Sequence, residues 1–139
     1  MFKHILVPTD LTEKSQQALA IAVKIALHDQ SKITLLHVIE TIEDSEDNEF
    51  SDFYQKLTKR ARRMMERMLD FVENESLSVD KEILYGKRLA EIIRYSNDKE
   101  IDLIVVSSHK IDKDNLNQGW GTISYKVGIL SQCPVLLVK

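Results

Sequence analysis

The sequence predicts an α/β fold in which a single doubly wound, five-stranded parallel sheet carries helices on both faces, in a flavodoxin-like or Rossmann-like layout. Short runs of β-branched residues and leucine alternate along the chain with longer segments whose apolar residues recur at three- and four-residue steps. Such alternation requires crossover connections, which are right-handed and cover both faces of a parallel sheet. With 139 residues, the chain has the length of one ordinary domain, and we expect residues 1–139 to form it.

A change in the spacing of apolar residues marks the first strand and helix. Residues 5–7 are Ile-Leu-Val, a strand-like run ended by Pro8, which cannot donate to a sheet ladder. Residues 12–28 then follow helical spacing, with Asp10 and Thr12 as alternative caps.

The second and third strands flank a long amphipathic segment. Residues 33–38 are almost continuously apolar, as in a strand covered on both faces. After an acidic stretch at 40–52, an apolar stripe predicts a helix over about 50–75, with a basic cluster on the remaining positions. Residues 79–85 predict a weaker strand, because charged residues interrupt it before Gly86.

The last third of the chain repeats the alternation. Apolar residues within 89–96 predict a third helix, and 101–106 is the most hydrophobic strand. A polar loop follows at 107–120, then a fourth helix at 121–130 and a final strand at 135–138. The predicted order is therefore β-α-β-α-β-α-β-α-β.

Composition excludes several classes of function. The chain has 19 basic and 22 acidic residues and a net charge of −3, without the basic excess of nucleic-acid binders, so we expect no nucleic-acid partner. No apolar run approaches the roughly 18 residues of a membrane span, and the start lacks the features of a signal peptide. We therefore expect no membrane partner and a cytoplasmic location. Cys133, the only cysteine, excludes an internal disulfide and a multi-cysteine zinc site, and we expect no metal site and no required cofactor.

Polar residues follow several of the predicted strands. In an open parallel sheet, ligands bind beyond the carboxyl ends of the strands, where the winding direction reverses. The candidates are Asp10 after the first strand, His37 and Glu40 at the second, residues 107–110 after the fourth, and Gly121-Thr122 at the start of the last helix. A helix start favours an anion, because its N–H groups are free and the helix dipole is positive there.

The motifs of common nucleotide-dependent enzymes are absent. The four glycines form neither the P-loop pattern G-x-x-x-x-G-K-[ST] nor G-x-G-x-x-G. A phospho-receiver domain would need a carboxylate where Tyr85-Gly86 ends the third strand. Ser107 and Ser108 lie next to His109, but adjacency does not create a nucleophile–base pair, and no G-x-S-x-G elbow exists. We therefore expect no enzymatic activity and no catalytic residue.

Several segments carry a more specific pattern. They are Lys-His-Ile-Leu-Val-Pro-Thr-Asp at 3–10, Leu-His-Val at 36–38, Asp-Leu-Ile-Val-Val at 102–106, and the stretch from Gly-Thr-Ile-Ser at 121–124 to Cys-Pro-Val-Leu-Leu-Val at 133–138. In this order and spacing they resemble the universal stress protein family along nearly the whole chain. The resemblance implies a binding or sensing module of the stress response.

The nucleotide loop departs from the family pattern. ATP-binding members carry G-x-x-G after the fourth strand, then nine residues, then G-[ST]. Here Ser107 and Lys110 stand at the two glycine positions, and ten residues precede Gly121-Thr122. Glycine adopts backbone conformations that other residues avoid and lets the chain approach phosphates closely. We therefore expect this turn to be reshaped.

For a bound nucleotide, the resemblance assigns roles by position. Asp10 would lie near the ribose, and the Val38 backbone would read the adenine edge. The remaining residues of the expected nucleotide site are Pro8, Thr9, Ser107, Ser108, His109, Lys110, Gly121, Thr122 and Ile123. Asp10 fits a helix cap nearly as well, and Gly121-Thr122 also fits an ordinary helix start.

Three functions remain open. The first is a module that binds an adenine nucleotide, ATP or AMP, and biases assembly with protein partners. The second, favoured by the lost glycines, is a dimeric interaction scaffold that binds no nucleotide. An ATP hydrolase has the least support, since no general base is evident beyond Asp10 and His109. The resemblance also implies a homodimer through the last strand, Val135 to Val138, whose apolar edge would otherwise stay unpaired.

Overall fold

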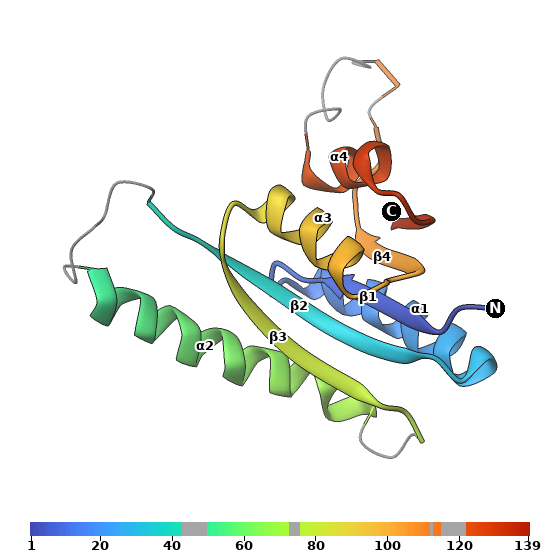
Figure 1. The fold of residues 1–139 in the computed structure, drawn as a ribbon, viewed down its shortest axis with the longest axis horizontal. Coiled ribbons are helices and arrows are strands. Elements are labelled where there is room, and N and C mark those ends of the chain that lie inside the picture. Colours follow the sequence, from blue (N-terminus) through green and yellow to red (C-terminus); the bar gives the residue numbers. More distant parts are fainter. Residues whose placement is uncertain (43–49, 73–75, 112, 115–121) are drawn as a thin grey trace.

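The computed structural model describes residues 1–42, 50–72, 76–111, 113–114 and 122–139. In chain order its elements are β1 (His4–Pro8), α1 (Glu13–Asp29), β2 (Lys32–Glu40), α2 (Ser51–Leu69), the 3₁₀ turn η2 (Asp70–Val72), β3 (Val79–Gly86), α3 (Arg88–Asp98), β4 (Leu103–Ser107), α4 (Ile123–Leu130) and β5 (Val135–Val138). The predicted alternation of strands and helices is confirmed (Figure 1).

The five strands form one parallel sheet in the order β3-β2-β1-β4-β5. This is the Rossmann-like form of the predicted layout, and it differs from the flavodoxin-like order 2-1-3-4-5. The chain winds outward from β1 to β3 and then returns to the other side of β1 for β4 and β5 (Figure 1). The winding direction therefore reverses between β1 and β4.

Helices cover both faces because the buried residues of each strand alternate between two cores. Ile5 and Val7 of β1 belong to the core shared with α1 and α2, in which Met65 is fully buried. Leu6, which lies between them, belongs to the opposite core, where Ile92 of α3 is its counterpart. Removing such side chains from water stabilises the layers by roughly 25 cal/mol per Å² of apolar area.

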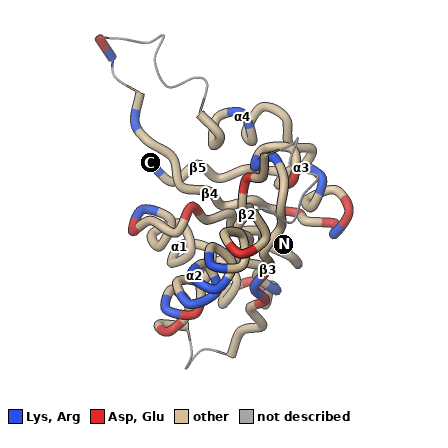
Figure 2. Tube along the Cα trace, turned by 90° about the vertical axis from the view of Figure 1, so that its left-hand side faces the viewer, with Lys and Arg blue, Asp and Glu red and all other residues tan. Residues whose placement is uncertain are grey.

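α2 is an amphipathic helix with a basic outer face. Ala61, Met65 and Met68 are buried. Figure 2 shows basic residues gathered along the helix, and the exposed ones include Lys59, Arg60, Arg62, Arg63 and Arg67. The helix was expected to reach residue 75 but ends at Leu69, where η2 begins. Among the described residues no helix, α2 included, has the length and apolar character that crossing a membrane requires.

The start of β4 is fixed by its contacts with β1. The strand begins at Leu103, two residues later than predicted, because the N–H of Ile101 donates to the carbonyl of Ser96 in α3 and not to a neighbouring strand. The Asp102 carboxylate then accepts the backbone N–H groups of Lys3 at 2.8 Å and His4 at 3.0 Å. These bonds hold the amino ends of the two strands together.

The ladder between β1 and β4 stops early. The strands are paired at Ile5–Leu103 and at Leu6–Ile104, although β1 continues to Pro8 and β4 continues to Ser107. Pro8 has no N–H to extend the ladder. The regular pairing therefore ends before the carboxyl ends of the two strands, at the point where the winding direction reverses and a ligand crevice is expected.

His4 makes the stability of this fold depend on pH. Burial, followed by the charge of Lys32, lowers the pKa of His4 below its ordinary 6.5, and the opposing effect of Asp102 is smaller. The ring nitrogen Nε2 is 2.8 Å from Thr34 Oγ1. The folded state favours the neutral ring. The contribution of His4 to the free energy of unfolding is therefore complete above pH 6.5, and it is lost as the pH falls below that value toward the pKa of His4 in the folded state.

We therefore predict that His4→Gln reduces the loss of stability on acidification. Urea unfolding at about pH 7.5 and about pH 5.5 measures it, since a histidine titrates across this interval. When the pH is lowered from the first value to the second, the free energy of unfolding should decrease more in the wild type than in the variant. Equal losses in wild type and His4→Gln would contradict the prediction.

Candidate functional site

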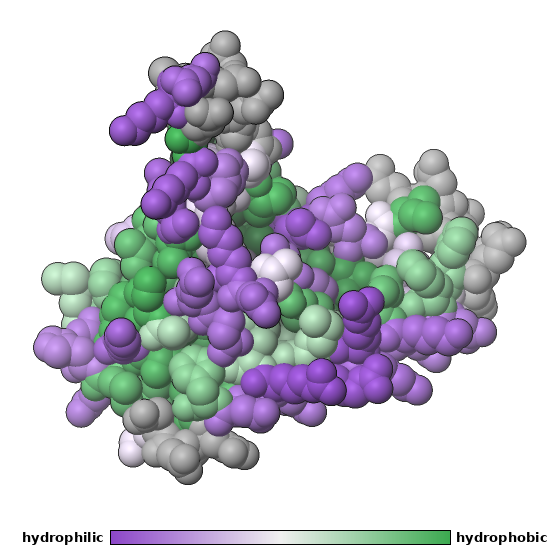
Figure 3. Space-filling model, turned by 180° about the vertical axis from the view of Figure 1, so that it is seen from behind, coloured by the Kyte–Doolittle hydropathy of each residue, from purple (hydrophilic) through white to green (hydrophobic). Residues whose placement is uncertain are grey.

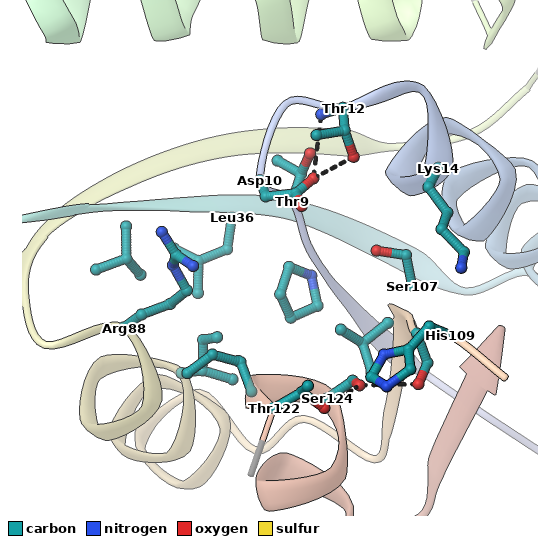
Figure 4. A pocket seen from close by; sticks show the side chains of 16 residues that line it. Thr9, Asp10, Thr12, Lys14, Leu36, Arg88, Ser107, His109, Thr122 and Ser124 are labelled. Carbon is teal, nitrogen blue, oxygen red and sulfur yellow. Dashed lines mark hydrogen bonds between the residues drawn. The ribbon is translucent and has the colours of Figure 1, made fainter. Parts of the chain in front are cut away.

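A cavity of about 340 Å³ opens at the carboxyl edge of the sheet, at the ends of β1 and β4. Residues from both strands, from β2 and from the starts of α1, α3 and α4 line it (Figure 4). Among the predicted site residues, those that line it are Pro8, Thr9, Asp10, Val38, Ser107, Ser108, His109, Thr122 and Ile123. Segments that lie far apart in the sequence thus meet at one cavity.

Two predicted residues stand apart from this group. Lys110 is exposed and does not line the cavity. Gly121 lies outside the described residues, as does most of the preceding loop. The expectation that the Lys110 side chain faces a ligand therefore has no support from its position.

The turn between β1 and α1 is held by the side chains of Thr9 and Asp10. Thr9 Oγ1 is 2.7 Å from Ser15 Oγ and accepts the N–H of Leu11 at 2.9 Å. Leu11 has a φ of 68°, so the turn passes through a left-handed residue. Asp10 Oδ1 accepts the N–H of Thr12 at 3.1 Å and its hydroxyl at 2.5 Å.

Asp10 is exposed and ionised at the mouth of the cavity. Partial burial alone would raise the pKa of Asp10, but the hydrogen bonds from Thr12 outweigh it and bring the pKa below the usual 3.8. Thr12, not Asp10, occupies the N-cap position of α1. Asp10 therefore shapes the entry turn, and its carboxylate lies where a ligand hydroxyl can reach it.

The end of β2 supports this turn from the other side. The N–H of Thr9 donates to the carbonyl of Leu36 at 2.8 Å, and His37 Nδ1 is 2.8 Å from the carbonyl of Thr9. His37 and Glu40, the candidates on β2, line a neighbouring cavity of about 410 Å³ that shares Asp10 and other residues with the first. The two cavities therefore adjoin along the carboxyl edge.

The segment after β4 is tied to α4. Ser108 Oγ is 2.8 Å from Ser124 Oγ, and both residues are buried. The Tyr125 hydroxyl donates to the carbonyl of His109, whose ring packs edge-on against the Tyr125 ring with centroids 5.2 Å apart. These contacts keep hydroxyl groups and the start of α4 on one wall of the cavity.

This arrangement is suited to binding. Within the described residues no hydrogen bond joins His109 to Ser107 or Ser108, so no nucleophile–base pair is formed there. The same part of the chain has no group of three or more His, Cys, Asp or Glu side chains that could hold a metal ion. Hydroxyl donors and a carboxylate beside apolar walls are typical of a small-molecule site.

Two basic residues that line the cavity, Lys14 and Arg88, were not among the predicted site residues. Each lies in the first turn of a helix that follows a strand, α1 for Lys14 and α3 for Arg88. Helix starts lie at the same sheet edge as strand ends, so a basic residue in such a turn was the sequence feature that could have identified them. Figure 4 shows them on opposite sides of the cavity.

Comparison with known proteins identifies the chain's relatives. The profile of the universal stress protein family matches residues 1–139. A universal stress protein of Methanocaldococcus jannaschii is 29% identical over 157 aligned positions, covering 100% of this chain and 96% of the relative.

Solved structures agree with this relationship. UspA of Lactobacillus plantarum is 26% identical with a TM-score of 0.83, covering 99% of this chain and 98% of that one. A universal stress protein in complex with cAMP is 16% identical with a TM-score of 0.75, and the match covers 99% of this chain and 97% of that one. One from Archaeoglobus fulgidus in complex with dAMP, at 13% identity, covers 100% and 98% with a TM-score of 0.70. The last two support the fold alone, and the profile match decides the family: the chain belongs to the universal stress protein family.

Proposed function

We propose that this protein is a cytoplasmic, non-enzymatic sensing module that binds an adenine nucleotide in the cavity between β1 and β4. The observation that carries the proposal is the convergence of Asp10, Val38, Ser107 and Thr122, from four separate segments, on one cavity of about 340 Å³. This volume falls within the range of roughly 300–1,000 Å³ found for small-molecule sites. The relatives in complex with cAMP and dAMP support the same class of ligand.

The lining residues suit the parts of a nucleotide. Leu36, Ile92 and Val106 line the cavity with apolar side chains against which a base can pack. The ionised Asp10 carboxylate is an acceptor for ribose hydroxyls. The hydroxyl of Ser107 and the start of α4 offer donors to phosphate oxygens.

A second function, a scaffold that binds no nucleotide, is favoured by one observation. Lys110, which stands at a glycine position of the nucleotide loop, is exposed and does not line the cavity. In this position the Lys110 ammonium does not contact a phosphate bound in the cavity. The measurement below distinguishes the two functions.

Calorimetric titration tests nucleotide binding. We expect at least one of ATP, ADP and AMP to bind the wild type, and Asp10→Ala to weaken that binding about tenfold or more, the scale of a hydrogen bond to a charged group. Asp70→Ala is the matched control, because Asp70 is exposed and does not line the cavity. Folded protein that gives neither heat nor a thermal shift with any of the three would exclude the proposal in favour of the scaffold.

We also propose that the protein forms a homodimer through β5. The strand is at one end of the sheet, so its outer backbone groups are available to a partner strand. Leu136 is 39% exposed, and Ile129 and Leu130, at the end of α4, are 72% and 54% exposed. Figure 3 shows hydrophobic residues at the surface on the side where the C-terminus lies. Pairing two copies here would cover the strand edge and this apolar surface together.

Light scattering tests the dimer. The wild type should have the mass of two chains at micromolar concentration, and Leu136→Asp should shift it toward one chain, because a charge at a paired apolar edge opposes association. Leu27→Asp is the control, since Leu27 is similarly exposed, at 42%, but lies on α1. A monomeric wild type would refute the proposal, and so would a dimer that Leu136→Asp leaves intact.

A further inference from the structure

The charges around the cavity are distributed unevenly. Among the residues that the structure describes, three fully charged side chains line it, those of Asp10, Lys14 and Arg88. The Asp10 carboxylate is engaged by Thr12 through both the backbone N–H and the hydroxyl. Arg88 has an acidic neighbour, since its Nε is 4.0 Å from Glu40 Oε1. Each of these two charges therefore has a compensating group in the protein.

Lys14 differs from both. It is half-buried on the first turn of α1, and within the described part of the chain no carboxylate forms an ion pair with it. Lysine is rarely removed from water without an opposite charge, because desolvation of the ammonium is costly. A half-buried lysine without a carboxylate partner at the wall of a cavity is therefore arranged to meet an anion that comes from solution.

The surroundings of Lys14 fit the same kind of ligand. In Figure 4 its side chain extends from α1 toward Ser107 and His109, on the β4 side of the cavity, while Arg88 lies across from it. Ser107 can donate its hydroxyl, and Thr122 lines the same cavity from the start of α4. One side of the cavity therefore combines an ammonium with hydroxyl donors, which is the chemistry that binds a phosphate group.

We propose that Lys14 binds the phosphate nearest the ribose and so makes this cavity select nucleotides over nucleosides. This inference rests on the proposed function, because it assigns the orientation of an adenine nucleotide in the same cavity. The base lies toward Leu36 and Arg88, and the phosphate lies toward Lys14 and Ser107. Lys14 comes from α1 and supplies positive charge on the β4 side of the cavity. Lys110 does not line the cavity and so does not supply this charge.

The test compares AMP with adenosine, which differ only in the phosphate. The wild type should bind AMP about tenfold or more tightly than adenosine, the scale of a charge-assisted hydrogen bond. Lys14→Gln should remove most of this preference by lowering AMP affinity, and should leave adenosine affinity unchanged. Lys14→Arg should retain most of the preference, and Lys24→Gln, at an exposed position of the same helix, should behave as the wild type.

Salt gives an independent readout. Added NaCl should weaken AMP binding to the wild type but leave adenosine binding nearly constant, because only the phosphate interaction is screened. This difference should disappear in Lys14→Gln. Thermal unfolding verifies that each variant is folded, and Lys14→Met, which also removes the charge, replaces Lys14→Gln if that variant is not.

The outcomes separate this inference from the proposed function. Equal affinities of the wild type for AMP and adenosine, or a Lys14→Gln variant that keeps the full preference for AMP, would overturn the role of Lys14. The cavity would remain an adenine site in either case, since both ligands bind. Absence of binding by adenosine and by every nucleotide would overturn the proposed function itself, and the inference with it.

Discussion

The short ladder between β1 and β4 is the constraint on which the rest of the site depends. Its last pair is Leu6 with Ile104, and both side chains are fully buried in the core beneath α3 and α4. The sheet is therefore anchored directly below the carboxyl ends of the two strands. The helices that follow β1 and β4 lie on opposite faces of the sheet, and this reversal of winding opens a crevice at the ends of the two strands. The cavity follows from the fold and needs no additional element to form it.

Hydrogen bonds on the β1 side and on the β4 side hold the walls of the cavity in place. On the β1 side, Thr9 is bonded through its backbone to Leu36 and His37 and through its hydroxyl to Ser15. On the β4 side, Ser108 meets Ser124, and His109 meets Tyr125. Both sets tie a strand end to a neighbouring element, so the walls are fixed before any ligand arrives. Preformed walls reduce the entropy that binding must overcome.

The sequence predicted the site residues that follow the ends of strands. It did not predict those on helices whose side chains point into the cavity. Strand ends such as Asp10 and Ser107 were predictable, because topology alone brings the carboxyl ends of parallel strands to one edge. Lys14 was not, because apolar spacing locates a helix without showing which of its polar residues turns toward a cavity. The strand order was left between two layouts for a similar reason, since alternation requires crossovers but does not fix which edge each strand joins. Ile101 likewise begins the apolar run, but its N–H donates to Ser96 of α3, a contact that the spacing of apolar residues did not reveal.

An NMR titration with AMP tests whether an adenine nucleotide occupies the cavity at the carboxyl ends of β1 and β4. Backbone amides of Asp10, Val38, Ser107 and Ile123, which come from separate segments that line the cavity, should shift together with one shared affinity. Amides at the end of α1 and on the basic face of α2 should remain unchanged at the same AMP concentrations. Shifts confined to α2, or no shifts at the cavity, would contradict binding of an adenine nucleotide in this cavity.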